Sequence, residues 1–433
     1  MTNPACKNIL RLIICLILGM FELVSMSNSF GGGFQLWEQN VTNIENFHAG
    51  RAALANDASI AYDNPAGITR IKNQQVVVGG MGIMTDIRFD GQIANCLTLG
   101  GEIFCGSPTT GTAQGGSFSF IPDLHYVAPL SSNWGFGLSV VAPYGSDVEW
   151  GQSSFINPIV TRARLQVVDI APALGFKVTN KLALGMGFDI EKMSAELNSI
   201  LVSMPSIIKG YDTAYGYHAG ALYEFNPATR IGLAYHSQVI HHLNGTSLYN
   251  GIASRANSSI YLPPDTTLSI YHSINSQWAI MGTIIYAQWN IIHNLVVNNA
   301  SGLQQLNGGV PLSIDFPQNF RNSWTYSIGA DYSPTEKLTL RAGFGYDQTP
   351  TRNGYRILQL PDSDRYDLSV GGHYQVNKVF GFDLGWTHVF LQHAAINPPL
   401  HPELFPLLMQ PSVQGKTFPS ADVFGAQITW NFI

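Results

Sequence analysis

The chain has 433 residues, a formal net charge of −6 and only 12% charged residues, against roughly 25% in soluble domains. No basic stripe occurs, which argues against a nucleic-acid partner. Beyond the N-terminus there is no run of about 20 apolar residues, which argues against a helical membrane protein. The length allows two or three soluble domains or one large closed sheet, and strands that alternate apolar and polar residues would give the observed mean hydropathy of +0.07.

Residues 1–29 are predicted to be an export signal. Lys7 and Arg11 supply the positive region, an apolar stretch follows at 12–21, and small residues at 27–29 supply a cleavage site. The apolar stretch is too short to span a bilayer comfortably. We therefore expect the mature protein to act beyond the inner membrane.

Removal of this signal leaves two cysteines, Cys96 and Cys105, in a polar, Gly-rich stretch. In an oxidising compartment we expect them to form a disulfide that closes a short surface loop. Two free thiols are the alternative. No histidine or further cysteine lies nearby in the sequence, so neither a metal nor another cofactor is expected.

The segment 30–72 lacks the pattern of a strand. It contains three consecutive glycines at 31–33, a short helical candidate at 49–55 and a turn sequence at 64–67. It is too short for an independent domain, but the lumen of a wide barrel could hold it. We therefore divide the chain into a signal peptide (1–29), an N-terminal hatch or plug (30–72) and a transmembrane β-barrel (73–433).

From about residue 74 onward, segments with alternating side chains repeat. In one of them Phe380, Phe382 and Leu384 fall on one face, while Gly381 and Asp383 fall on the other. The last strand ends at the chain terminus, as is usual for outer-membrane barrels. The pattern predicts an all-β, antiparallel transmembrane barrel of about 14 strands. The strands are expected to start near residues 74, 117, 133, 160, 181, 212, 229, 260, 277, 323, 337, 364, 378 and 418.

Short and long connections alternate between these strands. Short turns such as 131–133, 179–180 and 333–335 are predicted to face the periplasm. Apolar clusters near 200–208 and 404–409 could capture a ligand, or pack between loops or against lipid. Longer polar stretches are predicted to be extracellular loops at 89–116, 196–211, 244–259, 297–320 and 391–416.

An ordered series of motifs along the mature chain resembles the FadL/TodX family of outer-membrane transporters for long-chain fatty acids and other hydrophobic compounds. The resemblance implies a 14-stranded barrel with an N-terminal hatch, in the outer membrane of a Gram-negative bacterium. The motifs are Gly33-Phe34-Gln35-Leu36, Asp57-Ala58, Asn64-Pro65-Ala66, Pro143-Tyr144-Gly145, Tyr235-His236-Ser237, Tyr346-Asp347 and Pro361-Asp362.

The resemblance also implies a passive route for the ligand, and no enzymatic activity. A fatty acid or similar hydrophobic molecule would bind first between extracellular loops and then in an apolar lumen pocket. Movement of the hatch would then release it sideways into the bilayer. The expected partners are this ligand, outer-membrane lipid and lipopolysaccharide, and the protein is expected to be a monomer.

Three parts of the chain are candidates for ligand binding and gating. Phe34 is either a loose terminus or part of the deep pocket. The Asn64-Pro65-Ala66 motif is either a simple turn or part of the gate. Pro143 cannot complete a backbone ladder, so Pro143-Tyr144-Gly145 marks either the end of a strand or an opening in the wall.

Four charged residues are predicted to lie on the lumen faces of their strands, namely Arg341, Asp347, Arg365 and Asp367. They could brace the barrel against the hatch or meet a ligand carboxylate. The family's best-known fatty-acid carriers place a basic residue soon after the fifth strand. The corresponding stretch here, 196–199, has none, although Lys192 lies nearby. Neutral hydrophobic compounds therefore remain open as ligands.

Two other functions fit a barrel of this size. An outer-membrane enzyme such as a phospholipase would need a nucleophile or paired carboxylates near one rim, and no such constellation is evident. A non-specific porin would not need the hatch. Passage of small polar solutes without binding of a hydrophobic ligand would favour the porin.

Overall fold

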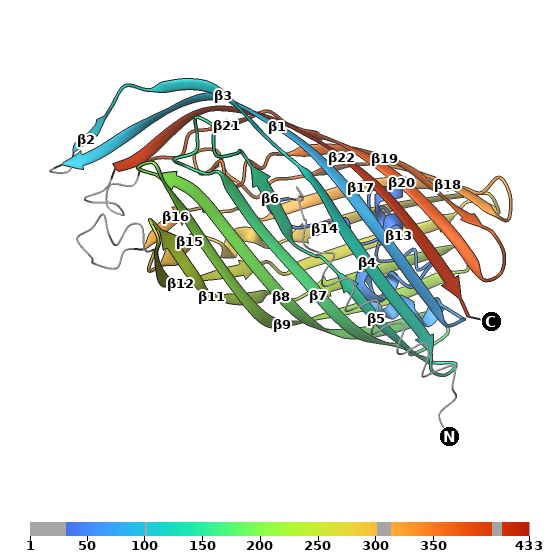
Figure 1. Cartoon of the computed structure of the whole chain (residues 1–433). Helices are drawn as coiled ribbons and strands as arrows, with labels where there is room; N and C mark the ends of the chain where they lie inside the picture. The colour runs from blue at the N-terminus through green and yellow to red at the C-terminus, as the bar shows by residue number, and fades with distance from the viewer. Residues whose placement is uncertain (1–31, 100–101, 301–312, 401–408, 433) are drawn as a thin grey trace.

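The computed structural model describes residues 32–99, 102–300, 313–400 and 409–432, so the predicted signal at 1–29 lies outside the described residues. Antiparallel strands close into a 14-stranded barrel, which confirms the predicted class (Figure 1). The sheet closes because β1 pairs with β4 along one edge and with β22 along the other. The wall strands are β1 (Gln75–Leu99), β4 (Phe118–Pro129), β5 (Trp134–Val141), β7 (Arg162–Lys177), β8 (Leu182–Leu201), β9 (Met204–Asn226), β10 (Thr229–His236), β13 (Asp265–Ser273), β14 (Trp278–Ala287), β17 (Ser323–Tyr332), β18 (Leu338–Asp347), β19 (Arg365–Gln375), β20 (Phe380–Leu391) and β22 (Met409–Asn431).

Much of the sequence predicted as extracellular loops is β-structure instead. Polar residues on both faces favour loops in a sequence pattern, but they equally suit hairpins that leave the membrane and stand in water. The strand predicted near 260 is also displaced, because Pro263 and Pro264 interrupt the ladder before β13 begins. The further strands are β2 (Glu102–Cys105), β3 (Thr109–Gly115), β6 (Gly145–Glu149), β11 (Val239–Tyr249), β12 (Ile252–Leu262), β15 (Asn294–Asn298), β16 (Ile314–Pro317) and β21 (Ala394–Ile396).

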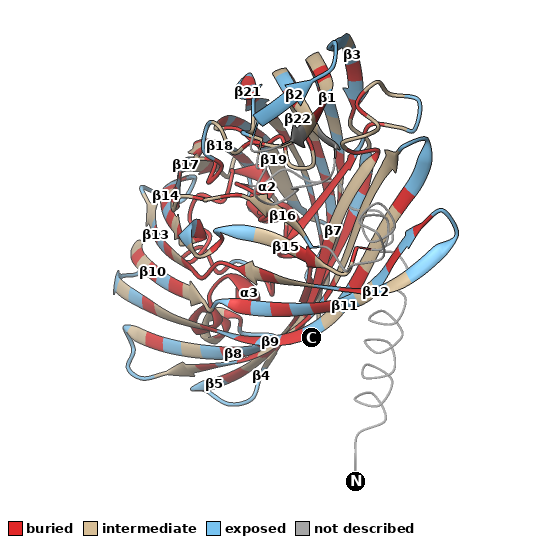
Figure 2. Ribbon diagram, turned by 90° about the vertical axis from the view of Figure 1, so that its left-hand side faces the viewer, coloured by how far each residue is buried: buried red, intermediate tan, exposed pale blue. Residues whose placement is uncertain are grey.

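The outward face of the barrel is apolar, as a lipid-facing surface must be. Buried and exposed residues alternate along the strands, with α2 (Val41–Glu45) and α3 (Ile60–Asp63) in the interior (Figure 2). At the end with short turns, aromatic pairs such as Trp134–Phe176 and Trp278–Tyr332 lie on this face, with ring centroids 4.4 Å apart in each pair. Aromatic belts of this kind mark membrane interfaces.

The N-terminal segment, residues 32–72, contains α2, α3 and the 3-10 helix η1 (Pro65–Arg70); a second 3-10 helix, η2 (Trp289–Ile291), follows β14. The helix predicted at 49–55 is wrong. Positive φ angles at Gly50 and Ala55 break the backbone there, and the helical turn lies earlier, in α2. Asn40 caps α2 by accepting a hydrogen bond from the Asn43 N–H. Within the described residues no helix is long and apolar enough to cross a bilayer.

The N-terminal segment packs inside the barrel against strands on several sides. α2 contacts β19, β20 and β22, whereas η1 contacts β7, β8 and β9. Glycines make this close approach possible: a Cβ atom added at Gly343 would overlap the backbone of Asn46, and one at Gly232 would overlap the carbonyl of Ala52. The wall and the segment therefore fit each other backbone to backbone.

We expect Gly343→Ala to destabilise the barrel or loosen the segment, because the new methyl group meets backbone rather than a flexible side chain. The cost should be about 1–3 kcal/mol, the usual range for overpacking. Thermal unfolding of the detergent-solubilised protein measures it. Gly282→Ala is the matched control, since an added Cβ there has no neighbour closer than 3.5 Å. Equal unfolding temperatures for both variants would contradict this packing.

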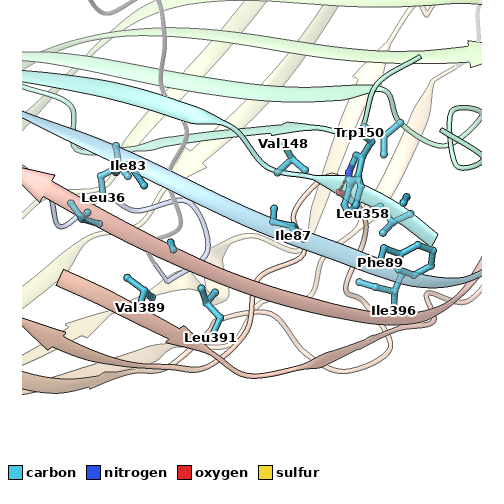
Figure 3. Close-up of a cluster of buried hydrophobic side chains, with 14 of the residues drawn as sticks. Leu36, Ile83, Ile87, Phe89, Val148, Trp150, Leu358, Val389, Leu391 and Ile396 are labelled. Atoms are coloured by element: carbon cyan, nitrogen blue, oxygen red, sulfur yellow. Dashed lines mark hydrogen bonds between the residues drawn. The ribbon is translucent and has the colours of Figure 1, made fainter. Parts of the chain in front are cut away.

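A large apolar cluster fills the lumen toward the end with long hairpins (Figure 3). Ile87 and Phe89 from β1 meet Val389 from β20 and Trp150, which follows β6. The Trp150 indole N–H donates a hydrogen bond to the Leu358 carbonyl at 3.0 Å. This part of the lumen is closed by packed side chains, so open space remains mainly on the side of β7, β8, β11 and β12.

The predicted disulfide is confirmed. Cys96 in β1 and Cys105 in β2 face each other in the ladder and are bonded. The bond joins two strands of the hairpin that extends beyond the barrel, shown at the far end of β1 in Figure 1. It staples this hairpin and lies away from the lumen.

Candidate ligand path

A deep apolar pocket lies between the N-terminal segment and the long strands β7, β8, β11 and β12. Its unfilled space is about 1160 Å³, the open mouth and the solvent in it included. Phe34 lies on its wall and meets Trp289 edge to face, with ring centroids 4.9 Å apart. Apolar lining residues include Leu165, Leu243, Ile260, Ile292, Leu295 and Phe320.

An outer groove adjoins this pocket on the side of the long hairpins. It contains about 1200 Å³ of space, its mouth included. Leu197, Ile208 and Phe316 line both hollows, so the two are neighbours along one apolar surface. Of the two predicted apolar clusters, the one near 200–208 contributes to the groove, while most of 404–409 lies outside the described residues.

Two cations that the sequence did not single out line the deep pocket, Arg164 and Lys209. Lys209 Nζ lies 3.2 Å from a carboxylate oxygen of Glu196, and Arg164 Nε lies 3.6 Å from one of Asp147. Lys192, the nearby base noted in the sequence, is exposed and does not line the pocket. The β8–β9 ladder sets Glu196 opposite Lys209, a pairing that the sequence alone does not reveal.

The wall of the barrel is broken beside Pro143. The ladder between β4 and β5 ends at Leu124 and Val140, and β6, which follows the break, pairs in register with β7 rather than β4 (Figure 1). Pro143 has no N–H with which to continue the ladder. The outer half of β4 and β6 are therefore not joined by a regular ladder.

The N-terminal segment occupies the inner side of this break. The Leu36 N–H donates to the Pro143 carbonyl at 2.8 Å, and the Gly145 N–H donates to the Phe34 carbonyl at 2.9 Å. Between them Gln35 and Tyr144 form an isolated antiparallel bridge. The Tyr144 hydroxyl donates to the Pro263 carbonyl at 3.0 Å. The broken wall is thus sealed from within by residues 34–36.

The Asn64-Pro65-Ala66 motif does more than turn the chain. The Asn64 side chain accepts from the Ala66 N–H at 3.1 Å and so caps η1. Its amide group also donates to the carbonyls of Ala52, at 2.7 Å, and Ala221, at 3.1 Å. Since Ala221 belongs to β9, this one side chain ties two parts of the N-terminal segment to the wall.

Arg341 joins the wall to α2. It forms a buried ion pair with Glu45 of the N-terminal segment, and its Nη1 lies 3.1 Å from Asp383 in β20. Asp331 lies 3.8 Å away on β17. The side chains of Arg341 and Glu45 are 5% and 0% exposed, so neither charge has water to replace its partner.

Arg365 forms a second buried network near the start of the segment. Its guanidinium lies 3.2 Å from Asp347 and 3.3 Å from Asp362, and Asp367 lies in the same strand, two residues further on, and is buried. Asp362 also accepts the Gly33 N–H at 2.8 Å. Burial raises the pKa of the Asp362 carboxyl to about 6. The two predicted lumen arginines thus pair with protein carboxylates, and Arg341 and Asp347 also contact the N-terminal segment.

No group of three or more His, Cys, Asp or Glu side chains is placed to hold a metal ion among the described residues. Only some of the predicted residues come together. Phe34 and Pro143-Tyr144-Gly145 meet at the wall break, whereas the Asn64 motif and the arginines hold the segment at other points of the wall.

The family model of the outer membrane protein transport proteins (OMPP1/FadL/TodX) matches residues 23–432. The chain belongs to this family. It is therefore an outer-membrane transport protein of a Gram-negative bacterium and not an enzyme, as the sequence predicted.

Curated relatives and solved structures cover nearly the whole chain. Outer membrane protein P1 of Haemophilus influenzae is 26% identical over 417 residues, 86% of this chain and 89% of that protein. The long-chain fatty acid transport protein of Escherichia coli K12 is 24% identical over 426 residues, 86% of this chain and 90% of that protein.

Two solved structures share the fold. A Pseudomonas aeruginosa FadL homologue has a TM-score of 0.81 at 22% identity, and covers 93% of this chain and 100% of its own. The Ralstonia pickettii toluene transporter TbuX has a TM-score of 0.63 at 20% identity, and the match covers 91% of this chain and 100% of TbuX. The Escherichia coli relative is named for long-chain fatty acids, and TbuX, which shares the fold, is named for toluene.

Proposed function

We propose that this family member carries long-chain fatty acids or similar hydrophobic compounds passively across the outer membrane. The ligand enters the outer groove, moves into the deep pocket and leaves through the wall beside Pro143. The observation that carries this proposal is the contiguity of the two apolar hollows, which share Leu197, Ile208 and Phe316. A water-filled pore would offer an alkyl chain no comparable surface.

A sideways exit is favourable on physical grounds. An alkyl chain regains about 0.8 kcal/mol per buried CH₂ when it enters lipid, whereas exit into the periplasm would return it to water. The broken ladder beside Pro143 supports such an exit, and residues 34–36 are placed to control it. In this proposal outer-membrane lipid accepts the ligand, and lipopolysaccharide surrounds the hairpins. One chain contains the whole path, so we also propose that the protein is a monomer.

Arg164 and Lys209 are the candidates for meeting a carboxylate in the deep pocket. Both line it, and both already lie near protein carboxylates, Asp147 and Glu196. A ligand carboxylate would have to compete with these partners, whereas a neutral ligand would not. The pocket thus suits neutral hydrophobic compounds as well as fatty acids.

A retention experiment tests the proposal. The detergent-purified protein is incubated with a mixture of fatty acids and aromatic hydrocarbons, then washed and analysed for retained molecules. We expect a hydrophobic ligand to be retained. Retention of none, together with passage of small polar solutes through the protein in liposomes, would favour a porin instead.

Filling the deep pocket should abolish this retention. Ala195 lies on the pocket wall, so Ala195→Trp would occupy the space of an alkyl chain and lower retention about tenfold or more. Ala330→Trp is the matched control. Ala330 lies on the same outward face of β17 as Tyr326 and Ile328, away from the pocket. Equal retention by both variants would place the ligand elsewhere.

A further inference from the structure

A second, polar cavity lies beside the wall break. It is small, with about 20 Å³ of room for the centre of a water-sized group, and lies between the N-terminal segment and strands β8, β10 and β11. Pro143 and Tyr144 form part of its wall. Tyr144 also packs in the apolar cluster that contains Phe34 and Leu243, two residues of the deep pocket. The polar cavity therefore lies next to the deep pocket, at the point where the ladder is broken.

Three polar atoms on the lining of this cavity have no hydrogen-bond partner among the described residues: Arg51 Nη1, His236 Nε2 and Gln35 Oε1. Arg51 and Gln35 are only 4% and 3% exposed. Their other polar atoms are engaged, since Arg51 Nε donates to Asp63 at 2.7 Å and Gln35 Nε2 donates to Asp265 at 3.1 Å. Buried polar atoms without partners are costly, so the cavity suits a small polar group that both accepts and donates.

Each of the three carboxylates on the lining has a histidine beside it. Asp189 lies 2.5 Å from His218 and Glu191 lies 3.1 Å from His241. Asp265 lies 3.8 Å from His236. The carboxylates of the lining are therefore partnered by histidines rather than by arginines or lysines.

Three further carboxyl groups lie near the cavity. Asp63 pairs with Arg51, Asp212 lies 3.2 Å from His241, and Asp169 is fully buried beside Asp189 and Glu191. Six carboxylates thus face four basic groups, Arg51 and the three histidines. Carboxyl groups therefore outnumber basic groups around the cavity. A ligand carboxylate would meet this excess in a low-dielectric site.

We propose that this cavity is a head-group site on the exit path, and that it admits a small polar head without negative charge, such as a hydroxyl. The inference rests on the proposed function and narrows its substrate class. The head would accept from Arg51 Nη1 and donate to Gln35 Oε1, while the alkyl tail stays in the deep pocket. A carboxylate can accept but not donate, and it adds to the excess of carboxyl groups.

A matched pair of ligands tests this proposal. Cells that express this protein as their only transporter of this kind receive a long-chain primary alcohol or the fatty acid of equal length, at about pH 8, where the acid is ionised. We expect the alcohol to enter about tenfold faster. The double variant Asp189→Asn with Glu191→Gln should raise uptake of the fatty acid about tenfold and leave the alcohol within about twofold.

Two further variants make the result decisive. Asp86→Asn removes an exposed carboxylate from β1, away from the cavity, and should leave the ratio of the two rates unchanged. Gln35→Met removes the unpartnered acceptor and should slow the alcohol while retention in the deep pocket persists. If the double variant does not fold, the head-group site is still tested by the ratio of alcohol to fatty-acid uptake in the wild type and by Gln35→Met.

Equal uptake of alcohol and fatty acid by the wild type, with no change in Gln35→Met, would overturn the head-group site. Retention of hydrocarbons by the purified protein is measured in parallel, because it depends on the deep pocket alone. Loss of retention would refute the proposed function. Normal retention with equal uptake would refute only the head-group site.

Discussion

A disulfide between the N-terminal segment and the wall break is expected to stop uptake. Gln35 and Tyr144 are directly opposed between two backbone hydrogen bonds, which places them as a non-hydrogen-bonded pair with Cα atoms about 4.5 Å apart. That spacing suits a disulfide. In the double variant Gln35→Cys with Tyr144→Cys, oxidation should fix residues 34–36 against the break and lower uptake about tenfold or more.

The same variant supplies its own control, because reduction should restore uptake. Each single cysteine variant, and the wild type with its native Cys96–Cys105 bond, should respond little to reductant. Ligand retention by the purified, oxidised double variant should persist, since the deep pocket opens toward the outer groove. Undiminished uptake in the oxidised form would show that the ligand does not need the segment to leave the break.

Replacing Arg341 is expected to have the largest effect on stability. Arg341→Gln would leave Glu45 buried without its cation, and Asp383 with only His373, 2.9 Å away, as a basic partner; breaking a buried ion pair typically costs about 3–5 kcal/mol. Because Glu45 belongs to the N-terminal segment, part of that cost can be relieved by release of the segment from the wall. We therefore expect a lower unfolding temperature and a larger ion conductance in planar bilayers.

Two variants separate charge burial from a general loss of arginine. Arg88→Gln removes one partner of an exposed pair with Asp90, where both side chains are 40% exposed or more, and should cost only about 0–1 kcal/mol. Adding Glu45→Gln to Arg341→Gln should recover part of the lost stability. If Arg88→Gln and Arg341→Gln unfold alike, the ion pair does not hold the segment.

Local patterns were sufficient to predict the wall of the barrel. Alternation along each strand, such as Phe380 against Gly381, decides which residues face lipid, and it needs no knowledge of distant parts of the chain. Proline chemistry likewise marked Pro143 correctly as a place where the ladder fails. The same local view failed where strands leave the membrane, because hairpins in water lose the alternation and resemble loops.

The site depended on contacts that no local pattern reveals. Arg164 and Lys209 lie far apart in the sequence and reach one pocket because β7, β8 and β9 are neighbours. Glu45 and Arg341 are separated by 296 residues. A usable signal did exist for the histidine–carboxylate cluster: Asp189 falls on the lumen face of β8, where a charge needs a partner.

Labelling with a photoreactive hydrophobic ligand tests the central claim most directly. The protein is reconstituted in lipid, loaded with the ligand from the outside, illuminated and analysed for labelled residues. The proposed path predicts labels on the deep pocket, such as Leu243 and Ile260, and around Pro143. Labels on Thr69 and Lys72, at the end of the barrel with short turns, with none around Pro143, would contradict a sideways exit.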